Sequence, residues 1–306
     1  MKISILTATY NRAEYLKKLY KSLVQNSKFN IKLEWLIMDD GSTDNTKEVV
    51  NLFMSETKEN LFLDIKYYLQ ENQGKMVAIN NLIQYISDDS ILLIECDSDD
   101  YFPDNAIQII SEKYSSIDDS KNIYALCFLK NDQNLCNIGN LFKSDNYETN
   151  MFNLYFKDGI CGDKALVYLT KIRKQYKYKL EKNENFITEA RLHNEMDKEY
   201  NIICFNTPIM ICEYLNEGYS SNIKNTYLKN PYGYFEYFKQ LFSFDMHNVL
   251  FSKRLYAIKH YILFGYLTKQ KKLLKNINGF TNKFLFIILY VPGIIKSYLY
   301  KKNELN

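Results

Sequence analysis

Residues 90–100 read SILLIECDSDD, an apolar run followed at once by a cluster of acidic side chains. A short apolar run of this kind is typical of a buried strand, and α/β sheets bind ligands beyond the carboxyl ends of their strands. Crowded carboxylates repel one another unless a cation intervenes, and Mg²⁺ typically takes one or two carboxylates together with phosphate oxygens. The stretch therefore indicates either a metal site for a phosphorylated ligand or an acidic surface turn.

The segments around this stretch alternate between strand and helix patterns. Strands are predicted over 3–9, 33–38, 63–69, 90–95 and 123–129, and helices over 15–24, 44–54, 75–86 and 103–114. Such alternation predicts an α/β fold with a mostly parallel sheet and helices on both faces. The polar loops 9–12, 39–44 and 96–101 then gather along one edge of the sheet, which predicts a binding site there.

Two helix starts carry capping signals. Asn11 with Glu14 three residues later is expected to cap the first helix, and Thr43 or Asp44 is expected to cap the second. Residues 120–215 are less regular, and from Pro231 onward the pattern is helical and rich in aromatic residues. In the less regular part we expect a turn at 159–163, a helix over 185–200 with Thr188 near its start, and short strands at 202–205 and 208–212.

Charge is distributed unevenly along the chain. The 306 residues carry a formal net charge of only +3, and 46% are hydrophobic, which is enough for a full core in one large or two modest domains. Residues 251–306 hold eleven Lys or Arg against one acid, Glu304, which leaves 28 basic and 35 acidic residues before them. A basic, aromatic-rich helical tail indicates either binding to a membrane surface or packing with its lysines in water.

The cysteine pattern, together with the lack of a signal-peptide pattern and of an expected membrane span, favours a cytoplasmic protein. The six cysteines show no C-x-x-C pair and no zinc spacing, so we expect reduced thiols. The N-terminal run shows no signal-peptide pattern, and no apolar stretch is expected to reach the ~20 residues of a membrane span. No nucleic-acid-binding module accompanies the basic charge, so nucleic acid is not an expected partner.

Four motifs in order resemble family-2 glycosyltransferases of the GT-A fold. They are ILTATYNR (5–12), DDGSTD (39–44), NQGK (72–75) and DSDD (97–100), and the resemblance extends over about residues 1–215. It implies a Rossmann-like, mostly parallel sheet in a domain 1–225, with a nucleotide-binding half (1–105) and an acceptor half (106–225). Residues 226–306 would form a helical C-terminal extension.

The resemblance also implies an activity. Such enzymes move a sugar from a nucleotide-diphosphate donor, by default a UDP-sugar, to an acceptor hydroxyl with inversion, usually with Mg²⁺ or Mn²⁺. Bacterial surface polysaccharide or glycolipid synthesis is the expected context, by analogy alone. A nucleotidyltransferase acting on sugar phosphates, or a non-catalytic sugar-binding homologue, stays open as the alternative. The absence of G-x-G and of a P-loop motif disfavours dinucleotide oxidoreductases and P-loop NTPases.

Carried over position by position, the motifs assign the donor site. Thr9 and Tyr10 would line the nucleotide pocket, and Asp40 would accept hydrogen bonds from the base or ribose. Gly74 would allow close backbone approach, while Lys75 could reach a phosphate. The other residues implied to contact the donor are Asn72 and Asp97.

The metal and the general base follow from the same resemblance. Asp99 is expected to be the direct metal ligand, with Asp100 as a second candidate, and the metal would neutralise charge on the leaving diphosphate. Glu189, in the first turn of a predicted helix, would be the base, although a glutamate there also stabilises the helix dipole. Asp163 is the second candidate for the base and could instead shape the acceptor pocket. Residues 213–222 resemble a loop that covers the donor.

Overall fold

The computed structural model describes residues 1–118, 120–181, 184–213 and 223–304, which form two compact units. The first unit contains residues 1–150, 160–177 and 199–215, and the second contains 151–159, 178–198 and 216–306. The chain therefore passes between the units several times. The division at residue 225 that the sequence predicts stays a prediction.

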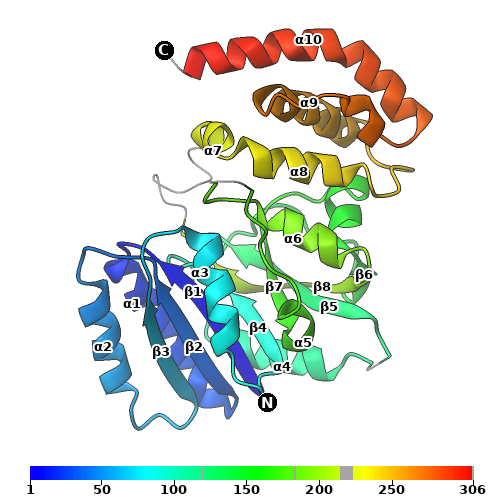
Figure 1. Cartoon of the computed structure of the whole chain (residues 1–306). Coiled ribbons are helices and arrows are strands. Elements are labelled where there is room, and N and C mark those ends of the chain that lie inside the picture. Colours follow the sequence, from blue (N-terminus) through cyan, green and yellow to red (C-terminus); the bar gives the residue numbers. More distant parts are fainter. Residues whose placement is uncertain (119, 182–183, 214–222, 305–306) are drawn as a thin grey trace. The chain divides into compact units, whose positions relative to one another are not determined.

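The first unit is built on one eight-stranded sheet with the order β3-β2-β1-β4-β7-β5-β8-β6 (Figure 1). Its first half is fully parallel, as predicted, and consists of β1 (Lys2–Thr9), β2 (Lys32–Asp39), β3 (Leu63–Leu69) and β4 (Leu92–Glu95). In the second half β5 (Ile123–Asn131) and β8 (Asn201–Ile211) are parallel to each other, while β7 (Lys164–Leu169) and β6 (Tyr147–Thr149) run antiparallel to their neighbours.

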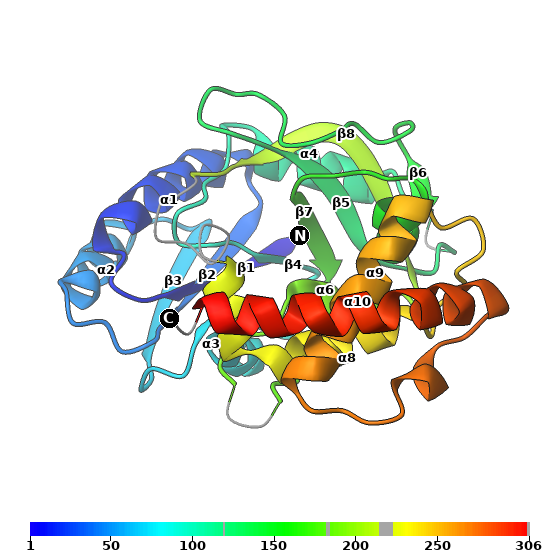
Figure 2. The ribbon, with the colours of Figure 1, turned by 90° about the horizontal axis from the view of Figure 1, so that it is seen from above.

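Helices cover both faces of this sheet, which confirms the predicted α/β architecture. The helices α1 (Ala13–Asn26), α2 (Thr46–Glu56) and α4 (Ala106–Ser115) share one core with inward-facing strand residues such as Ile5 and Trp35. On the opposite face α3 (Lys75–Leu82), followed by the 3₁₀ turn η2 (Ile83–Tyr85), packs against β1 and β2 (Figure 2). Two short elements complete the unit, η1 (Ser27–Phe29) and α5 (Thr170–Arg173).

Three local expectations were wrong. The strand β7 was not predicted, although it lies between β4 and β5 in the middle of the sheet. The two short strands expected at 202–205 and 208–212 are one strand, β8, whose pairing with β5 is interrupted at Leu129, next to Pro208, because proline has no N–H to donate. Asn11 does not cap α1, since its backbone is left-handed (φ 52°) and its side chain bonds to another loop.

The second unit is helical, as the tail pattern predicts. Its helices α8 (Pro231–Leu241), α9 (Phe251–Leu267) and α10 (Phe280–Glu304) pack one on the next (Figure 1). Aromatic side chains join them, for example Phe235 stacked on Tyr261 with ring centroids 5.3 Å apart. The remaining elements are η3 (Asn153–Lys157), α6 (Glu189–Met196), α7 (Ile223–Lys229) and η4 (Leu273–Asn276).

The last helix corrects an expectation about length. The stretch Phe280–Lys302 of α10 has 23 residues and is long and apolar enough to cross a membrane, whereas no such stretch was expected from the sequence. The apolar stretch 284–295 is short. The helix nevertheless continues on both sides of it through tyrosines and small residues, and no acidic residue interrupts it there. Only 11% of the apolar window is buried, so most of this helix is not part of a protein core.

Candidate functional site

The carboxyl ends of the first three strands lie level with one another. Thr9 of β1 is the register partner of Asp39 in β2, which in turn pairs with Leu69 in β3. The loops that follow are tied together by hydrogen bonds: the backbone N–H of Thr43 donates to Oδ1 of Asn11 over 2.7 Å, and the N–H of Asn11 donates to Ser42 Oγ over 2.9 Å. The polar loops therefore meet at one edge of the sheet, as the sequence predicts.

Asp40 organises the third loop of this edge. Its side chain is buried and accepts hydrogen bonds from Gln70 Nε2 (2.7 Å), the N–H of Gln73 (2.8 Å) and the N–H of Gly74 (2.7 Å). Gly74 has φ of +93°, a conformation that suits glycine. Two carboxylate oxygens offer about four acceptor positions, so three are used within the protein. The structure thus gives Asp40 a positioning task, and its expected bonds to a base or ribose stay a prediction.

The acidic stretch begins directly after β4 and is held by lysines from two sides. Lys75, the first residue of α3, forms an ion pair with Asp97 Oδ1 over 2.7 Å. Burial alone would raise the pKa of Asp97, but the ammonium groups of Lys75 and Lys130 lower it. The loop from β3 to α3 and the loop after β4 are thereby joined at Lys75 and Asp97, and the roles of these two residues and of Gly74 in donor binding stay predictions.

Asp100 has a buried partner that sequence reasoning missed. Its Oδ2 lies 3.1 Å from Nζ of Lys130, at the end of β5, and Cys212 Sγ donates to the same oxygen over 3.3 Å. Burial would lower the pKa of Lys130, but the facing Asp100 carboxylate raises it well above its usual value. Both side chains are largely buried, with 16% and 8% exposed. Burial raises the pKa of Asp100 in spite of this ammonium group. Asp100 is nevertheless already paired within the protein, which disfavours the prediction that it is a second metal ligand.

Asp99 has no such neutralising contact among the described residues. Burial, together with the nearby charges of Asp97 and Asp100, raises the pKa of Asp99 to about 6. A carboxylate that is crowded by like charges and partly buried gains from a cation, so the site fits a divalent metal held by Asp99, with Asp97 beside it. Within the described residues no group of three or more His, Cys, Asp or Glu could hold a metal. A metal here would take the rest of its ligands from phosphate oxygens and water.

Three further predicted donor residues line the same edge. Thr9 is buried, and its Oγ1 has no hydrogen-bond partner among the described residues, although buried polar groups are almost always paired. Tyr10 is 47% exposed, which leaves its ring accessible to a planar ligand. Asn72 is exposed in the turn before Gly74. Their contacts to a nucleotide stay predictions.

Asp163 lies in the predicted turn, in the first unit. The turn packs against residues 138–140 so closely that a Cβ on Gly162 would lie 2.6 Å from the carbonyl oxygen of Ile138. Gly162 has φ of +80°, so glycine is required here for two reasons. Asp163 itself is exposed, and its charge contributes, after burial and Asp100, to the raised pKa of Cys212.

Glu189 lies in the second unit, as the first residue of α6, with Thr188 as its N-cap residue. The helix is shorter than expected, because it ends at Met196. The donor-covering loop suggested for 213–222 falls outside the described residues except for Glu213, which forms an ion pair with Lys18. The catalytic role of Glu189 and that of the loop stay predictions.

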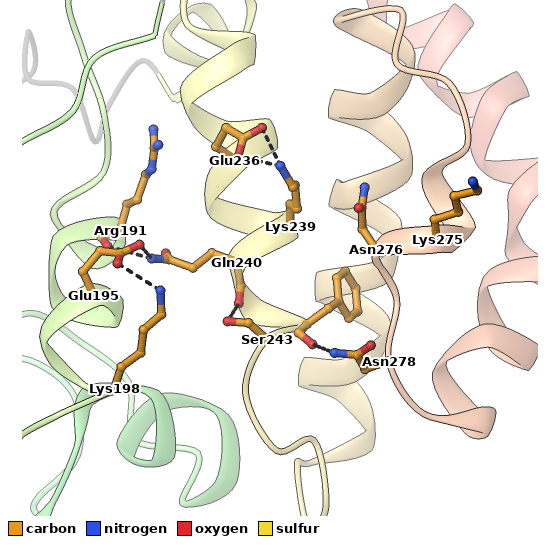
Figure 3. A pocket seen from close by; sticks show the side chains of 11 residues that line it. Arg191, Glu195, Lys198, Glu236, Lys239, Gln240, Ser243, Lys275, Asn276 and Asn278 are labelled. Atoms are coloured by element: carbon orange, nitrogen blue, oxygen red, sulfur yellow. Dashed lines mark hydrogen bonds and ion pairs between the residues drawn. The ribbon is translucent and has the colours of Figure 1, made fainter.

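The second unit also contains a polar pocket of about 420 Å³ (Figure 3). It is lined by side chains from α6 and α8, from residues that directly follow these two helices, and from the segment 275–278. Its charges largely satisfy one another: Lys198 pairs with Glu195 (2.9 Å), and Lys239 pairs with Glu236 (3.0 Å), as the dashed lines show. None of the predicted site residues lines it.

Comparison with known proteins gives a family match over more than half of the chain. Residues 4–176 match the model of glycosyl transferase family 2. Over 119 residues the chain is 34% identical to the uncharacterised glycosyltransferase MG060 of Mycoplasma genitalium, an alignment that covers 38% of this chain and 37% of that one. The chain spans only about a third of the length of the curated relatives it matches.

Solved structures share the fold over nearly the whole chain. The structure of residues 1–349 of Staphylococcus aureus TarS in complex with UDP superposes with a TM-score of 0.56 at 16% identity, covering 97% of this chain and 89% of that one. A mannosyltransferase from Pyrobaculum calidifontis in complex with GDP-Man and Mn²⁺ gives a TM-score of 0.54 at 12% identity, covering 98% and 84%. At such identities the likeness shows the fold alone.

Proposed function

The chain belongs to glycosyl transferase family 2, and on that premise we propose that it moves a sugar from a nucleotide-diphosphate donor to an acceptor hydroxyl, with inversion at the anomeric carbon. The observation that carries the proposal is the convergence of four loops at one sheet edge of the first unit. Asn11, Ser42, Gly74 and Asp97 come from these four loops, and hydrogen bonds or ion pairs link each loop to another. Such an edge is where open α/β sheets bind nucleotides.

The donor would lie along this edge with its base near Tyr10 and its diphosphate near Asp99. Thr9 and Asn72 would contact the nucleoside, and Asp40 would hold the backbone of Gln73 and Gly74 against it. Lys75 would face the diphosphate as a point charge. UDP-sugars are the first donors to test, since the TarS structure holds UDP, and GDP-mannose is the second, since it is bound in the mannosyltransferase.

Mg²⁺ or Mn²⁺ would be held by Asp99, with Asp97 close by through the ribose or a bound water. When bound, the metal supplies Lewis-acid neutralisation of charge on the leaving diphosphate. Asp100 would not be a ligand, because Lys130 and Cys212 already engage it. Its side chain would instead tie this loop to Lys130 at the end of β5, while the backbone N–H of Asp100 closes a turn on the carbonyl of Asp97 over 3.1 Å.

Glu189 would act as the general base that accepts the proton of the attacking hydroxyl, with Asp163 as the alternative from the first unit. The acceptor would belong to a surface polysaccharide or a glycolipid. We place the reaction in the cytoplasm, where reduced thiols persist, in keeping with six cysteines that show no C-x-x-C pair in the sequence.

Release of nucleoside diphosphate from UDP- and GDP-sugars, with Mn²⁺ and without acceptor, tests the proposal. We expect slow, metal-dependent release by the wild type and a loss of at least about a hundredfold in Asp99→Asn, since charge stabilisation of the leaving group is lost. Asp104→Asn is the matched control, because Asp104 is exposed five residues further on. Glu189→Gln should keep donor binding in calorimetry and lose turnover.

The other outcomes each have a meaning. If no donor binds or turns over, the chain is a non-catalytic homologue. If the protein instead makes nucleoside triphosphate from donor and pyrophosphate, it is a nucleotidyltransferase. If Asp163→Asn loses turnover while Glu189→Gln does not, the base is Asp163.

A further inference from the structure

The helix α10 presents two different faces along its length. One face packs on α9: Asn282, Phe286 and Ser297 are at most 5% exposed, and Gly293 lies so close to Ile262 that an added Cβ would be 2.9 Å from its Cγ2. These positions recur at spacings of four and seven residues, as one side of a helix requires. The packed face of α10 is therefore narrow and, apart from Phe286, these positions carry small or polar residues.

The opposite face is a row of exposed apolar side chains. Phe280 is 85% exposed, Ile287 60%, Val291 65% and Ile295 57%, and their spacing of four or seven residues puts them on one side. The other exposed apolar residues near this row are Phe284, Ile288, Tyr298 and Leu299. A continuous apolar patch of this kind marks an interaction site, and we call this row the α10 face.

The charged residues that precede and follow the apolar part of α10 in the sequence have one sign up to residue 303. Four exposed lysines precede the helix, at positions 269, 271, 272 and 275, and Lys301 and Lys302 lie exposed at its end. Residues 251–303 contain no Asp or Glu. An apolar face flanked by basic side chains complements the surface of a bilayer with anionic headgroups, where the apolar side chains enter the headgroup boundary and the lysines meet the phosphates.

The packing of α10 on α9 favours a helix that lies on the bilayer over one that crosses it. Asn282 on the packed face accepts a hydrogen bond from Arg254 Nη1 over 3.0 Å, and a helix crossing the membrane alone would have to expose this polar side to lipid. We propose that α10 lies in the plane of an anionic membrane surface, with the α10 face inserted and the opposite face held on α9. This proposal goes beyond the sugar transfer and does not rest on it.

Vesicle flotation of the full chain tests the proposal without any enzymatic step. We expect binding to vesicles of phosphatidylcholine and phosphatidylglycerol in a two-to-one ratio, and binding at least about tenfold weaker to pure phosphatidylcholine. Replacing lysines 269, 271, 272 and 275 by glutamine should weaken binding by about fivefold for each lysine that touches the surface.

Two matched triple variants test how much the apolar side chains of the α10 face contribute to vesicle binding. The triple variant Ile287→Ser, Val291→Ser, Ile295→Ser removes three side chains of the α10 face. The control Leu52→Ser, Leu61→Ser, Leu141→Ser removes three exposed leucines of the first unit, which are 55%, 84% and 55% exposed. We expect the first variant to lose vesicle binding by at least about tenfold and the control to bind like the wild type.

Several results would overturn the proposal. They are no binding of the wild type to anionic vesicles, equal binding of both triple variants, and retention in cell membranes after alkaline carbonate, which would show a spanning helix. A dimer in sedimentation velocity that Val291→Ser dissociates, without vesicle binding, would show that a second copy of the chain covers the α10 face.

Discussion

At the scale of single residues, Lys130 changes the interpretation of the acidic stretch. Three carboxylates in four positions suggest a metal held by several of them, but one of the three is neutralised from within by a buried ammonium group. The environments of the two remaining carboxylates, Asp97 and Asp99, then differ. Asp97 is paired with Lys75 and 49% exposed, whereas Asp99 keeps a raised pKa. This asymmetry makes Asp99 the residue that gains most from a cation.

The ion pair between Lys130 and Asp100 can be tested by a double-mutant cycle. Lys130→Met should destabilise the first unit by about 3–5 kcal/mol, because it leaves a buried carboxylate without a partner. Adding Asp100→Asn should recover a large part of that loss. Urea unfolding followed by the fluorescence of Trp35, the single tryptophan of the chain and a core residue of this unit, measures both. Additive effects of the two substitutions would show that the side chains do not interact.

At the scale of elements, α10 depends on a close approach to α9. Gly293 provides it, because its missing Cβ leaves room for Ile262, and Ser297 on the next turn donates from its Oγ to the Gly293 carbonyl over 2.7 Å. Pro292 stands just before this glycine inside the helix. At Gly293 and Ser297 the contact thus relies on small residues, while most of the larger apolar side chains, Phe286 excepted, lie on the other side.

We expect Gly293→Val to loosen α10 from α9. Overpacking costs about 1–3 kcal/mol, so amide exchange across 280–304 should become about five- to hundredfold faster, while exchange in β1, β2 and β4 stays unchanged. Ile295→Val, on the exposed α10 face, is the control and should leave exchange as it is. Hydrogen exchange followed by mass spectrometry measures these segments separately. Faster exchange throughout the first unit would contradict a local effect.

At the scale of the whole molecule, the chain combines an acidic body with a basic tail. The first 250 residues hold 28 basic and 35 acidic side chains, and residues 251–306 hold eleven and one. The proposed donor site belongs to the first unit, and the α10 face belongs to the second. Binding of the donor by the first unit and binding of a membrane by the second are therefore separate proposed properties, and separate experiments can measure them.

The thermal stability of the whole chain should respond to metal and nucleotide together. Since the described residues contain no group of three or more metal ligands, Mn²⁺ alone should raise Tm by about 1 °C or less, while Mn²⁺ with UDP or GDP should raise it by several degrees, more than the two separate effects combined. Differential scanning calorimetry measures this, and Asp99→Asn should remove the synergy. A large shift with Mn²⁺ alone would indicate a metal site made by the protein itself.

The sequence alone determined the first half of the sheet and the convergence of its polar loops at one edge. Strands and helices up to residue 115 follow local patterns of apolar residues, and parallel strands must bring their following loops to one edge. It therefore predicted that the loops 9–12, 39–44 and 96–101 would meet, while the place of Gly74 beside them was only implied by the family resemblance. Only the tertiary structure decided what each of them contacts. Asp40 binds backbone N–H groups, and Asn11 bonds to Thr43 instead of capping α1.

The tertiary structure also decided every feature that joins distant segments. The strand β7 is antiparallel between β4 and β5, and Lys130 and Cys212 reach Asp100 from 30 and 112 residues away. The sequence shows α10 as an apolar and basic stretch, but the face that packs on α9 and the face that stays exposed emerge only when the helices assemble. Local patterns report which residues avoid water, whereas charge pairing and exposure depend on partners that only the folded chain brings together.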